Sequence, residues 1–469
     1  MYYRLNSSCV LRGWKKTPWV LVRHPENSIR YLKQEEFQTL LLCDGSTDFE
    51  AEFISDKMRE ILCRYEADGV IEPCPQGEVL EEDQYYQYYD NRFVRSVLWS
   101  VTGYCNYRCR HCYMDAPDGK LGELSRQQVM NLIDQMSECG VLCVDITGGE
   151  PFVRKDFWQI IDRILSHKIA IGQIYTNGWL LTENVLDEFE KRNLKPEFSI
   201  SFDGVGWHDW MRGVQGAEKA ALRALELCER RGFPTSVELC VHKGSLSALP
   251  DTVELLAGMG VSRLRIGTIA ETDLWKKNSQ GNTMSFRAYI EEMIRYIPRF
   301  FRAEMPMDII LAGVIRLHKK SKAFSVIPMR YYGTSECENR LLCKAARYAC
   351  YITPEGRLLP CMPMTALKEQ ELFPLIQDIG LKKGLSDSFY MKIVDNRVGD
   401  LLKVNQKCAE CEHKYHCGGG CRASALEQTG DLMGSVEEQC ILWKEGYVER
   451  IQKAAETAIM EYCAEDAND

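Results

Sequence analysis

Three cysteines stand close together in the stretch "SVTGYCNYRCRHCYMDAP", residues 100–117. Cys105, Cys109 and Cys112 are four and three residues apart, so one tight loop can bring their thiolates to a common point, as iron-sulfur ligands require. A four-iron cluster that is bound by three cysteines keeps one iron open for another molecule. The triad alone leaves a zinc site and simply buried thiols as alternatives.

A second group of cysteines crowds the chain after about residue 335, where helix and strand periodicity fade. This segment, which includes the run "CAECEHKYHCGGGC", has too little apolar surface to fold by burial alone. We therefore expect metal ligation to organise it. The group comprises Cys343, Cys350, Cys361, Cys408, Cys411, Cys417, Cys421 and Cys440.

The 469-residue chain has 45% hydrophobic and 27% charged residues, which is typical of a globular protein of two to four domains. It contains no run of about 18 apolar residues and no signal-peptide core, so we expect a cytoplasmic protein that does not enter membranes. In that reducing compartment, clustered cysteines indicate metal ligands or catalytic groups rather than disulfides. The net charge of -9 argues against a nucleic-acid binder.

From about residue 96 the sequence alternates apolar strands with amphipathic helices. Ser125, with Gln128 placed for a capping box, predicts the start of the first helix, and Gly140 predicts its end. Serial strand-helix units predict an α/β fold with a parallel sheet, either open or curled into a barrel. In such sheets the active site lies at the C-terminal ends of the strands. Later strands are expected at "VLCVDI", "IAIGQIYTNG", "EFSISFDG", "TSVELCV" and "RLRIG".

Residues 1–75 predict a small unit of strands followed by helices. Aromatic and β-branched runs at 10–14 and 19–22 indicate strands, and Ser55 is a plausible N-cap of a helix that precedes the short strand "VIEP". Residues 76–95 are acidic and aromatic without clean periodicity, and we interpret them as a linker.

The cysteine triad resembles the signature of the radical S-adenosylmethionine (SAM) superfamily, Cys-x3-Cys-x2-Cys, which stands here as "CNYRCRHC". "TGGEP" resembles the family's turn that receives the SAM amino group, and "YTNG" and "ISFDG" match later strand ends. The arginine in "WMRG" resembles the residue that binds the methionine carboxylate. The resemblance implies a partial (βα)6 TIM-like barrel over residues 96–330. The SAM contacts that it implies are Tyr113, Gly148, Gly149, Glu150, Pro151, Asn177, Ser201, Asp203 and Arg212.

The resemblance also implies the chemistry. In that family the open iron chelates SAM through its amino and carboxylate groups, and an electron from the reduced cluster breaks a carbon-sulfur bond. The resulting 5'-deoxyadenosyl radical abstracts hydrogen from a substrate. The expected protein partner for this step is an electron donor such as a flavodoxin or a ferredoxin.

The second cysteine group resembles the SPASM extension of radical SAM enzymes, here residues 331–445, followed by a C-terminal helix over 446–469. The resemblance implies two auxiliary [4Fe-4S] clusters, hence three in all; a zinc-ribbon-like tail is the alternative. The first set would be Cys343, Cys350, Cys361 and Cys421, and the second Cys408, Cys411, Cys417 and Cys440. Cys337, just before this group, is a candidate for a redox or catalytic role. We interpret His413 and His416 as residues that lie at the surface or contact the metal ligands, and not as ligands themselves.

The N-terminal unit resembles the winged-helix-like peptide-recognition element of ribosomal peptide pathways, the fold of the pyrroloquinoline quinone peptide chaperone. Such modules bind a leader peptide as an extra strand at a sheet edge. Here the edge is expected between residues 2 and 30. The acidic segment "CDGSTDFEAEF" argues against the alternative of a winged-helix nucleic-acid binder.

These resemblances lead to the hypothesis of a radical SAM enzyme that modifies a precursor peptide, with thioether formation from a cysteine sulfur as the expected outcome. Carbon-carbon crosslinking, cyclopropane formation and other oxidative changes of a peptide are alternatives, because enzymes with the same domains carry them out. A sulfatase-maturing enzyme is a further alternative. An iron-sulfur redox regulator is the non-enzyme alternative.

Overall fold

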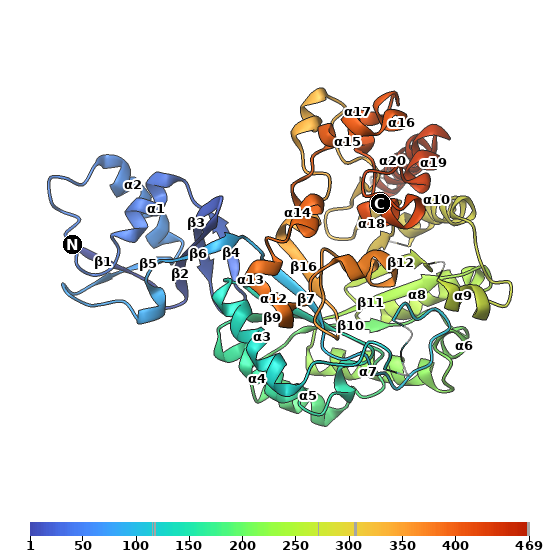
Figure 1. Ribbon diagram of the computed structural model, residues 1–469, viewed down its shortest axis with the longest axis horizontal. Helices are drawn as coiled ribbons and strands as arrows, with labels where there is room; N and C mark the ends of the chain where they lie inside the picture. The colour runs from blue at the N-terminus through green and yellow to red at the C-terminus, as the bar shows by residue number, and fades with distance from the viewer. Residues whose placement is uncertain (115, 117–118, 271, 304–306, 467–469) are drawn as a thin grey trace.

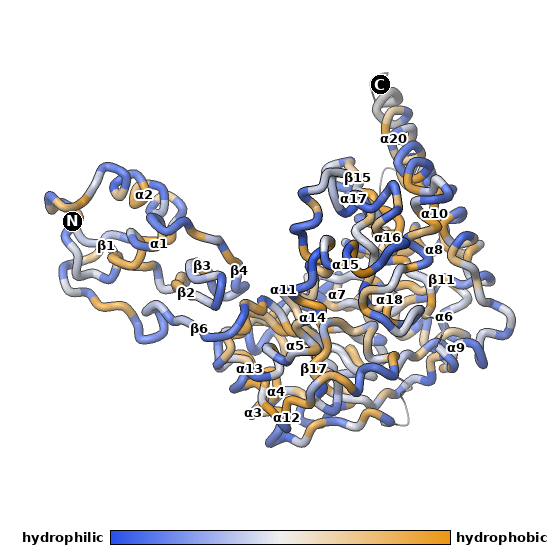
Figure 2. Tube along the Cα trace, turned by 45° about the horizontal axis from the view of Figure 1, so that its top comes forward, coloured by the Kyte–Doolittle hydropathy of each residue, from blue (hydrophilic) through white to orange (hydrophobic). Residues whose placement is uncertain are grey.

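The computed structural model describes residues 1–114, 116, 119–270, 272–303 and 307–466. A small N-terminal unit projects from one side of a larger body that holds the main sheet and the C-terminal region (Figure 1). Hydrophobic segments concentrate in that body, for example around α4 (Phe157–Ser166), α5 (Glu183–Glu190) and β17 (Leu358–Leu359) (Figure 2). Every described helix is too short or too polar to cross a membrane.

An eleven-stranded sheet forms the body, in the order β15-β14-β13-β12-β11-β10-β9-β8-β7-β16-β17. The six strands from β7 to β12 are parallel and follow one another in chain order, as the sequence predicts for a partial (βα)6 barrel. The strands are β7 (Ser96–Ser100), β8 (Cys143–Thr147), β9 (Ala170–Thr176), β10 (Glu197–Ser201), β11 (Thr235–Val241), β12 (Arg263–Thr268), β13 (Asp308–Leu311), β14 (Ile315–His318), β15 (Ala323–Val326), β16 (Ala349–Ile352) and β17.

Helices follow the strands and cover the outer face of the sheet. The helix after β7, α3, begins at Ser125, whose side chain accepts a hydrogen bond from the Gln128 amide in the predicted capping box. In β11 the side chains of Val237 and Leu239 are buried, whereas Glu238 between them lies on the other face. The helices are α3 (Arg126–Glu138), α4, α5, α6 (His208–Arg212), α7 (Ala217–Arg231), α8 (Leu249–Gly258), α9 (Asp273–Asn278) and α10 (Phe286–Arg302).

The N-terminal unit is a four-stranded sheet in the order β4-β3-β2-β6, with a separate β1-β5 pair and two helices. The interpretation of residues 76–95 as a linker is corrected here, because β6 within that segment pairs with β2. Its irregular sequence hides a strand that pairs on one side only. The elements are β1 (Tyr2–Leu5), β2 (Cys9–Lys15), β3 (Thr17–Arg23), β4 (Ser28–Tyr31), α1 (Gln34–Leu41), α2 (Asp56–Ala67), β5 (Ile71–Cys74) and β6 (Gln87–Arg92).

Hydrogen bonds join this unit to the body. Trp14 donates from its indole nitrogen to the Cys139 carbonyl at 3.1 Å, and Asn27 donates to the Leu142 carbonyl at 2.7 Å. Val10 and Trp14 also pack in one buried cluster with Leu142. The two parts are therefore in direct contact through buried groups.

The C-terminal region consists of short helices joined by loops, and it shares the main sheet through β16, which pairs in parallel with β7. The final helix, α20, covers the predicted position and packs on α10. The helices are α11 (Ala345–Tyr348), α12 (Ile376–Ile379), α13 (Leu381–Gly384), α14 (Ser388–Asp395), α15 (Val398–Val404), α16 (Gln406–Ala409), α17 (Lys414–Cys417), α18 (Arg422–Thr429), α19 (Glu437–Lys444) and α20 (Tyr447–Asp466).

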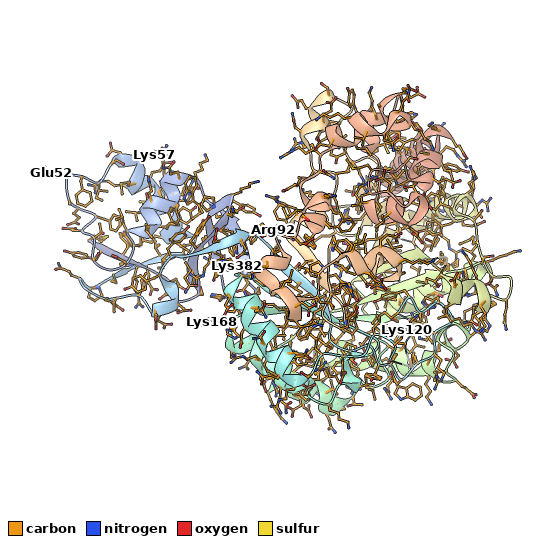
Figure 3. The ribbon with its side chains drawn as sticks, in the orientation of Figure 1. Glu52, Lys57, Arg92, Lys120, Lys168 and Lys382 are labelled. Atoms are coloured by element: carbon orange, nitrogen blue, oxygen red, sulfur yellow. The ribbon has the colours of Figure 1, made fainter. Side chains whose placement is uncertain are left out.

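Arg92, at the end of β6, joins the N-terminal unit to the C-terminal region (Figure 3). Its buried guanidinium donates to the carbonyls of Leu385, Ala346 and Arg347 at 3.2, 3.3 and 2.7 Å. It also donates to the Tyr390 hydroxyl at 2.8 Å. One side chain thus satisfies several buried acceptors of the C-terminal region.

We predict that Arg92→Met lowers the free energy of unfolding by about 3 kcal/mol or more, because it leaves buried carbonyls without donors. Arg287→Met is the control, since it removes an exposed ion pair with Glu445 and should cost less than about 1 kcal/mol. Anaerobic denaturant unfolding measures both. Equal costs for the two variants would contradict this role of Arg92.

Candidate functional site

The three-cysteine loop, residues 105–112, follows β7 and lies against α6. The amides of Arg108 and Arg110 donate to the carbonyls of Arg212 and Met211, at 3.2 and 2.9 Å. Within the loop the Cys112 amide donates to the Cys109 carbonyl at 3.3 Å. These main-chain bonds position the loop against α6.

The glycine turn after β8 approaches the start of this loop closely. The Gly149 amide donates to the Thr102 carbonyl and the Glu150 amide to the Tyr104 carbonyl, both at 2.9 Å. A Cβ atom at Gly149 would lie 2.2 Å from the Tyr104 carbonyl oxygen. Only glycine fits this turn, so the sequence "GG" positions the turn beside the cysteines.

A cavity of about 450 Å³ lies between the cysteine loop and the C-terminal ends of the strands. It therefore brings together nine of the residues expected at a SAM site. Its lining includes Cys105, Cys109, Cys112, Tyr113, Gly148, Gly149, Asn177, Ser201 and Arg212.

Glu150 and Pro151 do not line this cavity. The buried carboxylate of Glu150 accepts hydrogen bonds from the Asn177 amide at 2.8 Å and from the Thr176 hydroxyl at 2.9 Å. It also caps the short turn that begins at Pro151, by accepting from the Phe152 amide at 3.3 Å. Burial raises the pKa of Glu150 to about 7, against these hydrogen bonds, which lower it. The carboxylate thus orders two strand ends beneath the cavity.

Asp203 also lies behind the cavity wall, where it pairs with Arg212. Nε and Nη2 of Arg212 donate to the two carboxylate oxygens at 2.6 and 3.1 Å. Burial alone would raise the pKa of Asp203, but the charge of Arg212 outweighs it and holds this pKa well below its usual range. Asp203 therefore fixes Arg212, and Arg212 faces the cavity with Nη1 3.8 Å from the Cys109 sulfur.

Two thiols of the loop, those of Cys105 and Cys109, have raised pKa values. Burial raises the pKa of Cys105 to about 12, and it also raises that of Cys109, where Arg212 acts in the opposite direction. Buried thiols in a loop of polar residues match a bound cationic centre, which favours the thiolate form. The residues present therefore fit an iron-sulfur cluster.

A single zinc ion fits less well. Tetrahedral zinc at a Zn–S distance of 2.3 Å places its sulfur ligands about 3.8 Å apart. Among the described residues, one group of three or more His, Cys, Asp or Glu has all its ligand atoms within 4.8 Å of one another, namely His111, Asp203 and Cys240. The sulfur atoms of the three loop cysteines are thus farther apart than a zinc site requires. In the group of His111, Asp203 and Cys240, Asp203 is already paired with Arg212.

Five further residues line the cavity that the sequence motifs do not single out: Leu98, Glu238, Cys240, Arg265 and Met362. Glu238 and Cys240 occupy alternate positions of a strand that is otherwise apolar, which is a signal for side chains inside the barrel. Met362 follows Cys361 directly, and its sequence gives no such signal.

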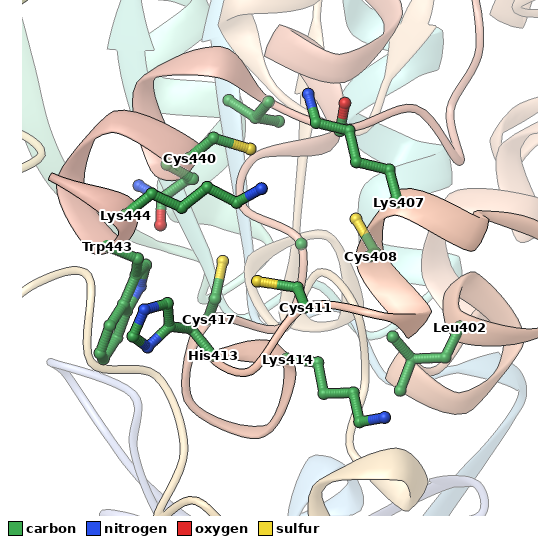
Figure 4. Close-up of a pocket in the computed structure, with 14 residues that line it drawn as sticks. Leu402, Lys407, Cys408, Cys411, His413, Lys414, Cys417, Cys440, Trp443 and Lys444 are labelled. Carbon is green, nitrogen blue, oxygen red and sulfur yellow. The ribbon is translucent and has the colours of Figure 1, made fainter.

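The second predicted cluster set comes together in the C-terminal region. Cys408, Cys411, Cys417 and Cys440 surround one pocket (Figure 4). Burial raises the pKa of Cys417 to about 11 and also raises that of Cys408. His413 lines the same pocket and stacks on Trp443 with ring centroids 5.1 Å apart. All four predicted thiols are thus adjacent.

The first predicted set comes together only in part. Burial, and then the charges of Cys421 and Cys343, raise the pKa of Cys361, so these three thiols are neighbours. Cys350 lies on β16, and the charges that act on its buried thiol are those of Arg92 and Cys139. The side chain of Cys350 packs in the core where β16 pairs with β7, so its membership of this set stays a prediction.

The cysteines outside the two predicted groups differ in exposure. Of those with described side chains, Cys63 is exposed, and Cys74, Cys143 and Cys240 are half-buried. Cys337 is buried in a small cluster against Leu342 and Val398, and Cys408 packs against that cluster. The side chain of Cys463 lies outside the described residues.

Comparisons with known proteins agree with this geometry. Residues 99–256 match the radical SAM superfamily. The AdoMet-dependent heme synthase of Methanosarcina barkeri is 24% identical over 74% of this chain and 96% of its own length. The PqqA peptide cyclase of Granulibacter bethesdensis is 25% identical over 72% of this chain and 84% of its own.

Among solved structures, Streptococcus suis SuiB bound to its precursor peptide SuiA has a similar fold. The TM-score is 0.63 at 16% identity, and the likeness covers 93% of this chain and 99% of SuiB. Coverage this high includes most of the N-terminal unit. The cysteine loop, the glycine turn and the cavity all fall in or beside the matched residues 99–256. The chain is therefore an enzyme that carries a radical SAM domain.

Proposed function

We propose that this enzyme modifies a ribosomally made precursor peptide, by abstracting a hydrogen atom from one of its carbons. The observation that carries the proposal is the cavity between the cysteine loop and the strand ends. It is lined by thiols on one wall and by polar side chains of β11 and β12 on the other, so it has room for a cofactor and a substrate group together.

Cys105, Cys109 and Cys112 would bind a [4Fe-4S] cluster, with SAM beside it against Gly148, Gly149, Asn177 and Ser201. The bound cluster and SAM supply a 5'-deoxyadenosyl radical. Arg212, fixed by Asp203, presents a guanidinium to the cavity for the methionine carboxylate. Tyr113 closes one side of the cavity, where it helps to exclude water.

The C-terminal region, residues 331–445, would bind two auxiliary [4Fe-4S] clusters that exchange electrons with the site. Cys408, Cys411, Cys417 and Cys440 form a complete set, whereas Cys343, Cys361 and Cys421 form a set of three. Met362, which follows Cys361, lines the cavity, so the set of three would lie near the proposed substrate. A flavodoxin or a ferredoxin would deliver the electrons.

The N-terminal unit would bind the leader of the precursor peptide as an extra strand. The outer strand of its sheet, β4, pairs with β3 on one side, so its other edge is available within the described residues. The fold likeness to SuiB, which was solved with its precursor peptide, supports this assignment. We extend the unit to residue 92 because β6 belongs to its sheet.

The bond that we propose is a thioether from a cysteine sulfur to a substrate carbon. Formation of this bond removes two hydrogen atoms from the peptide and consumes one thiol. Carbon-carbon crosslinking removes the same two hydrogens but leaves the thiol free. Alkylation of the product with iodoacetamide therefore distinguishes the two outcomes.

The first test uses the anaerobically reconstituted enzyme with SAM, a reductant and short peptides encoded beside its gene. We expect release of 5'-deoxyadenosine and a peptide product that is lighter by two hydrogens and lacks one alkylatable thiol. Cys109→Ala should abolish both, because it removes a cluster ligand. Cys228→Ala, a buried thiol of α7 outside the cavity, is the control. Unchanged 5'-deoxyadenosine release by Cys109→Ala would exclude the loop from the reaction.

The iron content tests the auxiliary sets. We expect about twelve irons per chain for three four-iron clusters. Cys411→Ala should lower this value by about four, whereas Cys350→Ala should leave it unchanged, because we propose that its core-packed thiol is not a ligand. An equal loss of iron in Cys350→Ala would contradict the proposed set of three.

Substitution of Glu150 tests whether this buried carboxyl group makes the stability of the protein depend on pH. The pKa of Glu150 in the folded protein is raised to about 7, so protonated Glu150 contributes to the free energy of unfolding. This contribution is fully present below the unfolded pKa, near 4.5, and is lost as pH rises through 7. The free energy of unfolding of Glu150→Gln relative to wild type should therefore shift in favour of the variant by about 3 kcal/mol from pH 4.5 to 8. Anaerobic urea unfolding measures this difference. A difference that does not vary with pH would contradict the raised pKa.

A further inference from the structure

Two oppositely charged side chains face each other on the cavity wall formed by β11 and β12. Glu238 and Arg265 are register partners on these parallel strands. Nη1 of Arg265 lies 3.3 Å from Oε2 of Glu238, and both residues line the cavity that the cysteine loop closes. Neither residue belongs to the set that we assign to SAM.

This pair is loosely held compared with the other arginine of the cavity. The side chains of Arg265 and Glu238 are 51% and 37% exposed, and a single contact at the long end of the hydrogen-bond range joins them. Arg212, by contrast, makes two contacts with the fully buried Asp203. The guanidinium of Arg265 therefore retains exposed donors that face the cavity.

The guanidinium fork of arginine matches a carboxylate, which it binds through two parallel hydrogen bonds. Glu238 does not fill this fork, because it occupies one donor only. Burial raises the pKa of Glu238 above its usual value, even though the charge of Arg265 acts against this effect. Glu238 is thus a weak partner that a better placed carboxylate can replace.

We propose that Arg265 binds a carboxylate of the peptide substrate inside the cavity, and that Glu238 keeps the guanidinium in place until the substrate enters. This inference rests on the proposed function, because it concerns the substrate of that same site. The carboxylate has two possible sources in a peptide, an acidic side chain and the C-terminus. Both present the same chemistry to Arg265.

Arg263 provides a matched control. It lies two residues before Arg265 on the same face of β12, but it is not part of the cavity lining. It pairs closely with Glu197, which also accepts a hydrogen bond from Gln173 at 2.7 Å. Its substitution removes the same charge from the barrel without touching the proposed site.

The experiment titrates four small probes into the cluster-loaded enzyme with SAM bound, under anaerobic conditions, and measures dissociation constants by NMR. N-acetylglutamic acid α-amide and N-acetylglutamine α-amide compare an acidic side chain with its neutral isostere. N-acetylalanine and N-acetylalanine amide compare a C-terminal carboxylate with its amide. We expect the acidic member of one pair to bind about tenfold more tightly than its neutral partner, and that pair identifies the source.

Substitutions of Arg265 and Glu238 should change the preference for the acidic probe in opposite directions. Arg265→Gln should abolish the preference for the acidic probe, whereas Glu238→Gln should increase it, because it removes the competing carboxylate. Arg263→Gln should leave the preference at the wild-type value. The increase in Glu238→Gln does not depend on Arg265→Gln folding well, and a purely structural role of the pair would not produce it.

Three results would overturn the inference. They are equal or undetectable binding of acidic and neutral probes to the wild type, a preference that persists in Arg265→Gln, and a loss of SAM affinity in Arg265→Gln, which would assign this guanidinium to the methionine carboxylate. Release of 5'-deoxyadenosine is measured in the same wild-type samples. If release fails, the proposed function fails; if release occurs without a preference, only the inference about Arg265 fails.

Discussion

The geometry of the cysteine loop depends on the buried ion pair between Asp203 and Arg212. Arg212 ends α6, a helix of five residues that is too short to be stable by itself. The pair anchors this helix to the end of β10, and the helix carbonyls in turn accept hydrogen bonds from the loop. Loss of one partner of a buried pair typically costs about 3–5 kcal/mol, because the other charge is left unpaired. The position of the three loop cysteines thus depends on the parallel sheet.

The sequence predicts this part of the fold well because its signals are local. Ser125 and Ser55 mark helix starts through hydrogen bonds to amides three residues later, and the structure contains both. The glycine turn and the cysteine loop follow strands whose ends must meet at one edge of a parallel sheet. Their proximity can therefore be predicted from the sequence without information about long-range contacts.

The features that the sequence does not predict depend on contacts between residues that are far apart in the chain. The family resemblance implies Cys350 as a ligand, yet the direction of its side chain is set by the pairing of β16 with β7, some 250 residues earlier in the chain. Residues 76–95 show no clean periodicity, yet they contain β6, whose pairing with the distant strand β2 the local sequence does not indicate. Glu238 and Arg265 become neighbours only when β11 and β12 align in register. Their charge within apolar strands was a signal, but it did not specify a partner.

Cys361 and Met362 are consecutive residues, yet one belongs to the thiol set of the C-terminal region and the other to the wall of the cavity. A peptide bond therefore links the thiol set of one part to the cavity wall in another. β16 reinforces this link, because it extends the same sheet that carries the cysteine loop. As a result, the C-terminal region is not an interchangeable module: a chimera that took this region from a relative would also take a new wall for its substrate.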